Sequence, residues 1–133
     1  MKVFADTSAL LAVLDAGDLK HTAAKAAWEK LLGGEADIVT HNYILVETSA
    51  LVLRRLGLEA LRVFEADMVP ILHIVWVTPE VHEAAVGAHL LAARRALSLV
   101  DCVSFEVMRR AGLRSAFAFD THFSGSGCEL LPG

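Results

Sequence analysis

The chain runs Val3-Phe4-Ala5-Asp6-Thr7-Ser8 near its start and Phe117-Ala118-Phe119-Asp120-Thr121 near its end. In both stretches a short apolar segment leads directly into an aspartate and a threonine. Apolar runs of this kind are typical of buried strands in a parallel sheet. In open α/β sheets the ligand crevice lies beyond the carboxyl ends of the strands. The repeated pattern therefore predicts that Asp6 and Asp120 meet at one edge of such a sheet.

Strands and helices alternate between these two stretches, which indicates an α/β fold with a central parallel sheet. Helix signals are clear at Gly33-Gly34, which ends one helix, at Thr78-Pro79-Glu80, which starts another, and at Ser98, which caps a third. Asn42 is the expected N-cap of the helix that ends at Gly57. The predicted strands are 2–5, 37–40, 72–77 and 115–119 with a last edge strand at 130–131, and the predicted helices are 7–14, 22–32, 42–57, 58–68, 81–95 and 98–112.

Size and composition set further bounds. The 133 residues suit a single domain that spans 1–133 and buries one core. Hydrophobic residues make up 55% of the chain before its nine glycines are counted, which exceeds the roughly 45–50% that ordinary domains reach with glycine included. We expect this surplus to lie at an interface with another chain, most simply in a homodimer.

Membrane, secretion and cysteine signals are all weak. The longest apolar runs fall short of the ~18 residues that a spanning helix needs, and the N-terminus lacks the features of a signal peptide, so we expect a cytoplasmic protein with no membrane contact. Cys102 and Cys128 are far apart and form no C-x-x-C motif. Neither a zinc site nor a disulfide framework is therefore expected, and Cys102 reads as a small core residue on a helix.

Two further acids, Glu47 and Asp101, bring the candidate carboxylates to four. Each has a structural alternative. Asp6 at a strand-to-helix junction also suits an N-cap, and Asp120 also suits the start of a turn. Asp101 lies three residues after Ser98 and so fits a capping box, in which the helix dipole would keep it ionised.

Glu47 is the most informative of the four because its helical neighbours are apolar. A carboxylate on an apolar stripe must be paired or coordinated, since a bare buried charge is very unfavourable. The alternative to a ligand role is a salt bridge to Arg54 or to another arginine. Together the four carboxylates predict an all-oxygen site, which suits Mg²⁺ or Mn²⁺ rather than zinc or copper. One or two such ions can activate water for attack on a phosphodiester.

These motifs resemble the PIN-domain ribonucleases, specifically the VapC-type toxins of type II toxin–antitoxin pairs. The matching pieces occur in the family's order and span nearly the whole chain: Phe4 to Leu10, Val46-Glu47, Leu97 to Phe105, and Phe119 to Phe123. The resemblance implies a three-layer α/β/α domain with a parallel sheet. It also implies an endoribonuclease that uses Mg²⁺ (or Mn²⁺) to cleave RNA, with a small antitoxin protein as its partner.

By residue, the resemblance places Asp6, Glu47, Asp101 and Asp120 in the family's four catalytic, metal-binding positions. Thr7, Ser8 and Ser104 correspond to supporting polar groups. Thr121 departs from the pattern, because the family often carries a basic residue between the aspartate and the position of His122. We expect RNA contact at this point to be weaker or to be supplied from elsewhere. For His122 itself, a hydrogen-bonded loop histidine is the favoured interpretation, and contact with phosphate or assistance to the site is the alternative.

The charge of the chain argues against broad attraction to nucleic acid, since the net charge is −4 and the pI is about 5.8. Bound cations would reverse the sign of an acidic cleft. Arginines occur in pairs at 54–55, 94–95 and 109–110, each in the last turn of a predicted helix. Cations there complement the helix dipole, so we expect most of these pairs to stabilise helix ends.

Two other functions compete with the nuclease. A phosphohydrolase with Asp6 as nucleophile also begins with a strand followed by an aspartate and a threonine, but that class needs a second aspartate where this chain has Ser8. A scaffold that binds RNA or a partner protein without cutting is the other alternative. The intact set of four acids favours the nuclease over both.

Overall fold

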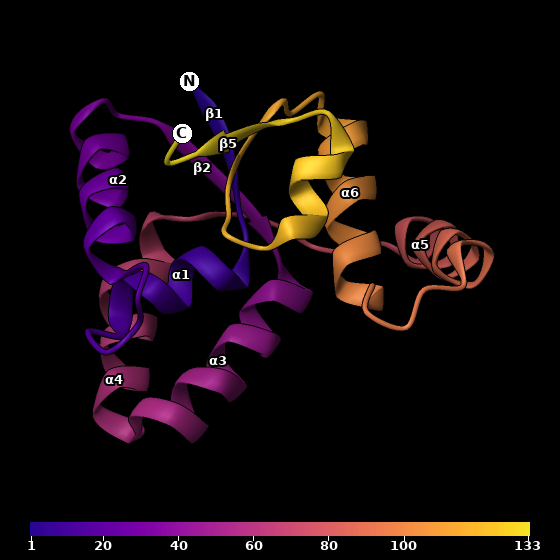
Figure 1. The fold of residues 1–133 in the computed structure, drawn as a ribbon. Helices are drawn as coiled ribbons and strands as arrows, with labels where there is room; N and C mark the ends of the chain where they lie inside the picture. Colours follow the sequence, from indigo (N-terminus) through magenta and orange to yellow (C-terminus); the bar gives the residue numbers. More distant parts are fainter.

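A computed structural model describes the backbone of residues 1–133 and every side chain except that of Ser126. Its centre is a parallel sheet of five strands in the order β3-β2-β1-β4-β5 (Figure 1). The strands are β1 (Lys2–Ala5), β2 (Asp37–His41), β3 (His73–Val75), β4 (Ser115–Phe117) and β5 (Glu129–Leu131). The predicted parallel α/β architecture is confirmed.

Helices cover both faces of the sheet and give three α/β/α layers, with α1 and α2 on one side and α6 on the other (Figure 1). The α-helices are α1 (Thr7–Leu14), α2 (His21–Gly33), α3 (Asn42–Leu56), α4 (Leu58–Val63), α5 (Pro79–Ala92) and α6 (Leu99–Ala111). No helix within the part of the chain that the structure describes is long and apolar enough to cross a membrane.

The strand order contains a topological switch point between β1 and β4. From β1 the chain moves outward through β2 to β3, then returns to place β4 on the other side of β1. Ala5 pairs with Phe117, so the carboxyl ends of these two central strands lie level. Ligands of open α/β sheets bind outside the carboxyl ends at such a point. Asp6 and Asp120 follow the two strands that flank it.

The core explains why the two quoted stretches form central strands. Val3, Phe4 and Ala5 on β1 are completely buried, and so is Phe117 on β4. Phe4 stacks on Phe123, with 6.0 Å between ring centroids, which anchors the turn that follows β4. Burying side chains of this size stabilises the fold by about 1.5–3 kcal/mol each.

The prediction that Asn42 caps α3 is wrong. The cap is His41, whose Nδ1 accepts the Ile44 N–H at 3.3 Å. Asn42 is instead the first helical residue, and its Oδ1 accepts the Val77 N–H at 2.7 Å. That bond ties the start of α3 to the segment after β3, so the side chain of Asn42 joins two chain segments rather than capping the helix.

Two predicted strands are shorter than expected and one predicted helix changes type. The 72–77 and 115–119 strands hold ladder pairs only at 73–75 and 115–117. The 58–68 helix continues from α4 into a π-helical turn, η1 (Phe64–Met68), where the Val69 N–H reaches back to the Phe64 carbonyl. Short 3-10 turns η2 (Val69–Ile71) and η3 (Thr121–Ser126) precede β3 and β5.

Candidate metal centre

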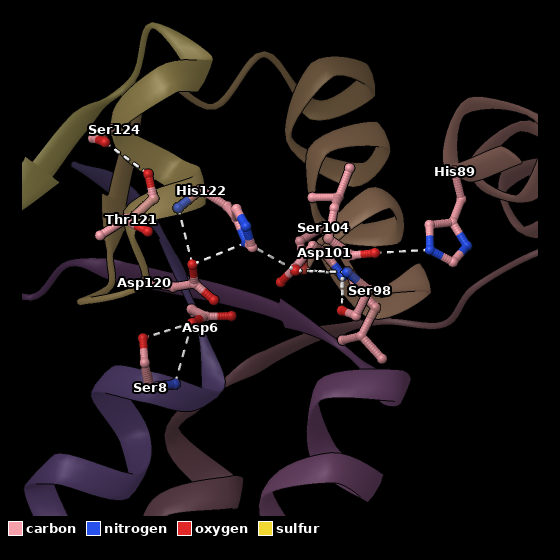
Figure 2. A network of polar contacts seen from close by, with 12 residues as sticks. Asp6, Ser8, His89, Ser98, Asp101, Ser104, Asp120, Thr121, His122 and Ser124 are labelled. Atoms are coloured by element: carbon pink, nitrogen blue, oxygen red, sulfur yellow. Dashed lines mark hydrogen bonds and ion pairs between the residues drawn. The ribbon is translucent and has the colours of Figure 1, made fainter. Parts of the chain in front are cut away.

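Three of the four predicted acids converge at the switch point. Asp6 follows β1, Asp120 follows β4, and Asp101 lies in the first turn of α6. Figure 2 shows their carboxylates directed into one space, with the ring of His122 beside them. Asp6 and Asp101 are buried, and Asp120 is half-buried. Residues that lie up to 114 positions apart in the chain therefore form one acidic group.

Each of the three acids also fills the structural role that the sequence offers it. Asp6 Oδ2 accepts the Ser8 N–H at 3.1 Å, and Asp120 Oδ1 accepts the His122 N–H at 2.9 Å. Asp101 Oδ2 accepts the Ser98 N–H at 3.0 Å in a complete capping box. Within the described part of the chain, the second oxygen of each carboxylate makes no hydrogen bond. Capping and cation binding are therefore compatible at all three positions.

Burial and the neighbouring charges both act on the carboxylate of Asp6. Burial raises the pKa of Asp6 from its ordinary 3.8 to about 6, and the negative charges of Asp101 and Asp120 add to the rise. The hydrogen bonds from Ser8 oppose it. The carboxylate thus lies in an environment that disfavours its charge, which is the condition that a bound cation relieves.

His122 belongs to the same group, a role that the sequence interpretation considered but ranked below that of a loop histidine. Its Nδ1 lies 3.1 Å from Oδ1 of Asp120 and 3.2 Å from Oδ2 of Asp101 (Figure 2). Ligand atoms of these three residues all lie within 4.8 Å of one another. The side chain is 14% exposed, so this histidine is not a solvated loop residue. The signal was present in the sequence as its position two residues after Asp120.

Glu47 lies on α3 and, like Asp6, is not among the three residues whose ligand atoms lie within 4.8 Å of one another. Its side chain is half-buried, and among the described residues it has no hydrogen bond or ion pair. The salt bridge that was the alternative for Glu47 is therefore not formed. Its neighbour Thr48 donates from Oγ1 to Oγ1 of Thr7, at 3.1 Å, so this turn of α3 lies against the residue that follows Asp6.

Ser8 holds Asp6 and fastens it to β4. Its Oγ donates to Asp6 Oδ2 at 2.6 Å and accepts the Phe119 N–H at 2.9 Å. One hydroxyl therefore connects the aspartate after β1 to the residue before Asp120. Ser8 also occupies the position where an aspartyl phosphohydrolase would need its second acid, and here that position is used to orient Asp6.

Beneath Asp101, a buried histidine joins α3 to α6. His41 accepts the Ile44 N–H at Nδ1, so its Nε2 carries the proton and donates to Ser104 Oγ at 2.9 Å. Ser104 donates in turn to the Val100 carbonyl at 3.0 Å. Burial lowers the pKa of His41 from 6.5 to about 4, which keeps the ring neutral near pH 7.

These two pKa shifts predict opposite dependences of stability on pH. Asp6 destabilises the metal-free fold above pH 6, and this effect disappears as the pH falls to 3.8. His41 acts the other way, because the unfolded chain takes up its proton at 6.5 and the folded chain only at about 4. Each effect amounts to about 3 kcal/mol, and the two pH windows overlap. As the pH falls from 7 to 4, the stability gained at Asp6 therefore nearly equals the stability lost at His41.

In Asp6→Asn the pH dependence of stability that is due to His41 should therefore no longer be offset. We expect the metal-free variant to be more stable than the parent by up to about 3 kcal/mol at pH 7.5, and this gain to vanish near pH 4. Urea unfolding of both proteins at several pH values measures the difference directly. A difference in unfolding free energy that stays constant between pH 7.5 and pH 4 would contradict the assigned environment of Asp6.

A hollow of about 390 Å³ opens beside the group and is lined by His122, Arg94, Leu97, Phe105, Thr121 and Gly125. It places the exposed Arg94 in the same hollow as His122. The expectation that Arg94 and Arg95 lie in the last turn of a helix is wrong, because α5 ends at Ala92 and Ala93 caps it in a left-handed conformation. Arg109 and Arg110, in contrast, pair with Glu106 in the last turn of α6, as expected of cations at a helix end. A larger hollow of about 640 Å³ between α2 and β5 shares no residue with the acidic group.

Comparison with known proteins agrees with this arrangement. Residues 3–125 match the PIN domain. Over 132 residues the chain is 35% identical to the "23S rRNA-specific endonuclease VapC20" of two Mycobacterium tuberculosis strains, and the match covers 98% of each chain. The crystal structure of M. tuberculosis VapC20, titled a Sarcin-Ricin loop cleaving toxin, superposes with a TM-score of 0.85 at 35% identity and 95% coverage of both chains. With its parallel sheet and its acids at the switch point, this chain belongs to the PIN-domain family.

Proposed function

We propose that this chain is a divalent-metal-dependent endoribonuclease whose whole length forms one PIN domain. The observation that carries the proposal is the meeting of Asp6, Asp101 and Asp120 at the switch point, in a chain related to an rRNA endonuclease. Carboxylates bind hard cations such as Mg²⁺. Such cations commonly bind the substrate phosphate in enzymes that hydrolyse phosphodiesters. The related protein is named a 23S rRNA-specific endonuclease, so structured ribosomal RNA is the first substrate to test.

The side chains that meet at the switch point suit a bound cation. Each of the three carboxylates keeps an oxygen that makes no hydrogen bond within the described part of the chain. The pKa of Asp6 is raised mainly by burial, and the charges of Asp101 and Asp120 add to the rise. The Nδ1 atom of His122 is buried against two of them without a hydrogen bond of good geometry. We assign Asp6, Asp101 and Asp120 as metal ligands, with Glu47 as the fourth acid, and Mg²⁺ or Mn²⁺ as the ion.

When bound, the ion neutralises phosphate charge and lowers the pKa of water so that it can attack phosphorus. The chain's own residues prepare the site for it. Ser8 fixes the rotamer of Asp6, and the capping box fixes Asp101. At Asp6 the two hydrogen bonds from Ser8 oppose the effect of burial and favour the ionised form, which is the form that a ligand needs. Thr7 accepts a hydrogen bond from Thr48, and Ser104 donates one to the Val100 carbonyl, so both hold the helical turns next to these acids.

We further propose protein partners for this nuclease: a second copy of the chain and a small antitoxin. Large apolar side chains are unusually exposed on several elements. The exposed fractions are 69% for Val46, 70% for Trp76, 73% for Leu90 and 87% for Leu91. Apolar surface of this kind on a soluble protein marks sites of association. The name of the VapC relative points to the class of partner, a toxin's cognate antitoxin.

The ends of the cleaved RNA test the proposed chemistry. With Mg²⁺ or Mn²⁺ the purified protein should cut RNA to leave 5′-phosphate and 3′-hydroxyl ends, because attack by water expels the ribose 3′-oxygen. Ribonucleases that use the substrate's own 2′-hydroxyl leave 2′,3′-cyclic phosphates instead. Ligation-dependent sequencing of the products, with and without EDTA, distinguishes the two. Cyclic phosphate ends, or cleavage that persists in EDTA, would show that the proposal is wrong.

A further inference from the structure

We propose that His122 is itself a metal ligand through Nδ1, so that the centre is a mixed oxygen and nitrogen site that favours Mn²⁺ over Mg²⁺. This inference rests on the proposed function and adds a residue that the four-acid pattern does not contain. It identifies which ion the centre prefers. The observation behind it is the position of the Nδ1 atom of His122.

The distances around Nδ1 suit ligands of one ion. Nδ1 lies 3.1 Å from Asp120 Oδ1 and 3.2 Å from Asp101 Oδ2. In an octahedral ion with ligands at about 2.1 Å, neighbouring ligand atoms lie roughly 3 Å apart. The nitrogen thus already has the spacing of a neighbouring ligand from each of the two carboxylate oxygens. Each of these oxygens accepts one backbone N–H and keeps a second lone pair for a cation.

The nitrogen lies at ion-pair distance from two carboxylates but is hydrogen-bonded to neither of them. It is buried and makes no hydrogen bond of acceptable geometry in the described part of the chain. Buried polar atoms almost always have a partner, and an exception needs a specific reason. A cation between the imidazole and the carboxylates supplies that reason, because it satisfies the nitrogen and both acids together.

The imidazole is held in place by its surroundings. The His122 N–H donates to Asp120 Oδ1 at 2.9 Å, which fixes the backbone of η3 against the acid. The next residue, Phe123, is completely buried and contacts the rings of Phe4 and Phe105 at 6.0 and 5.1 Å between centroids. Rigid support of this kind is what a preorganised ligand requires.

The donor set determines the preference among metals. Carboxylate oxygens suit Mg²⁺, Ca²⁺ and Mn²⁺, whereas imidazole suits transition metals. Of these three ions only Mn²⁺ is a first-row transition metal, and Mg²⁺ is held mainly by oxygen ligands. Adding one imidazole to a carboxylate site therefore strengthens Mn²⁺ binding more than Mg²⁺ binding. The competing explanation for the same distances is a charged imidazolium that bridges the acids and moves away when metal binds. The two explanations differ in whether nitrogen touches the metal.

Pulsed electron paramagnetic resonance on the Mn²⁺-loaded protein answers this question. We expect nitrogen hyperfine coupling from one histidine in the parent protein, and its loss in His122→Asn. His73→Asn is the matched control, because His73 is exposed on the edge strand β3 and should keep the coupling. In calorimetric titrations, His122→Asn should weaken Mn²⁺ binding about tenfold and Mg²⁺ binding much less.

Failure of this inference is distinguishable from failure of the proposed function. A parent protein that binds Mn²⁺ and cuts RNA but shows no nitrogen coupling would overturn the role of His122 alone. Equal weakening of Mn²⁺ and Mg²⁺ in His122→Asn would do the same. A parent protein that binds neither ion would overturn both proposals. The spectrum of the parent decides the question even if His122→Asn does not fold.

Discussion

Replacing Asp101 by asparagine should reduce metal-dependent RNA cleavage by about a thousandfold, a loss typical of removing a group that stabilises the transition state. The amide oxygen of asparagine can still accept the Ser98 N–H, so the cap of α6 is kept while the ligand charge is lost. The fold should therefore remain intact. Single-turnover cleavage of a labelled RNA, with circular dichroism as the check on folding, measures the effect.

The matched control for this variant is Asp67→Asn, which makes the same chemical change at an exposed residue in η1. Its activity should equal that of the parent. Glu47→Gln, on α3, should also reduce cleavage strongly if Glu47 is the fourth acid. An Asp101→Asn protein that is folded and still cuts at the parent's rate would exclude Asp101 from the metal centre.

A divalent cation should stabilise the folded protein by about 2.7 kcal/mol at a hundredfold excess over its dissociation constant. For a domain of this size that corresponds to a rise in Tm of roughly 10 °C. Below pH 6 protons compete for Asp6, so the rise should shrink as the solution is acidified. Thermal unfolding with Mn²⁺ and with Mg²⁺, at pH 7.5 and pH 5, tests both statements.

The double variant Asp6→Asn/Asp101→Asn is the control for specific binding. It should melt at the same temperature with and without metal, because two of the proposed ligands have lost their charge. An equal rise in Tm for the double variant and the parent would place the bound metal elsewhere on the protein.

Much of the fold was predictable because its signals are local. Apolar runs mark the central strands, and the capping box at Ser98 and the proline after Thr78 mark helix starts that the structure contains. The errors arose where distant contacts decide the outcome. Asn42 is a good cap in isolation, but its side chain bonds to Val77, which lies 35 residues away, and His41 takes the cap instead.

The site was predictable in part for the same reason. Asp6 and Asp120 each follow an apolar strand, so their meeting follows from the rule for parallel sheets. The approach of Asp101 depends on how α6 packs, and only the resemblance to PIN domains indicated it. His122 looked like a loop histidine because no local pattern shows that η3 turns its ring between two carboxylates. Among the described residues Glu47 has no hydrogen bond or ion pair that ties it to the other acids, and its role stays a prediction.

The bond between Ser8 and Phe119 joins residues 111 positions apart, which has a consequence for the order of events during folding. Pairings of such high sequence separation carry a large loop-closure entropy and form slowly. A ribosome that has made only the first hundred residues has produced α1 to α5 but neither β4 nor Asp120. The acidic group cannot be assembled until the end of the chain is available to pair with its beginning. Synthesis of this protein thus passes through a long stage in which the chain lacks a complete centre.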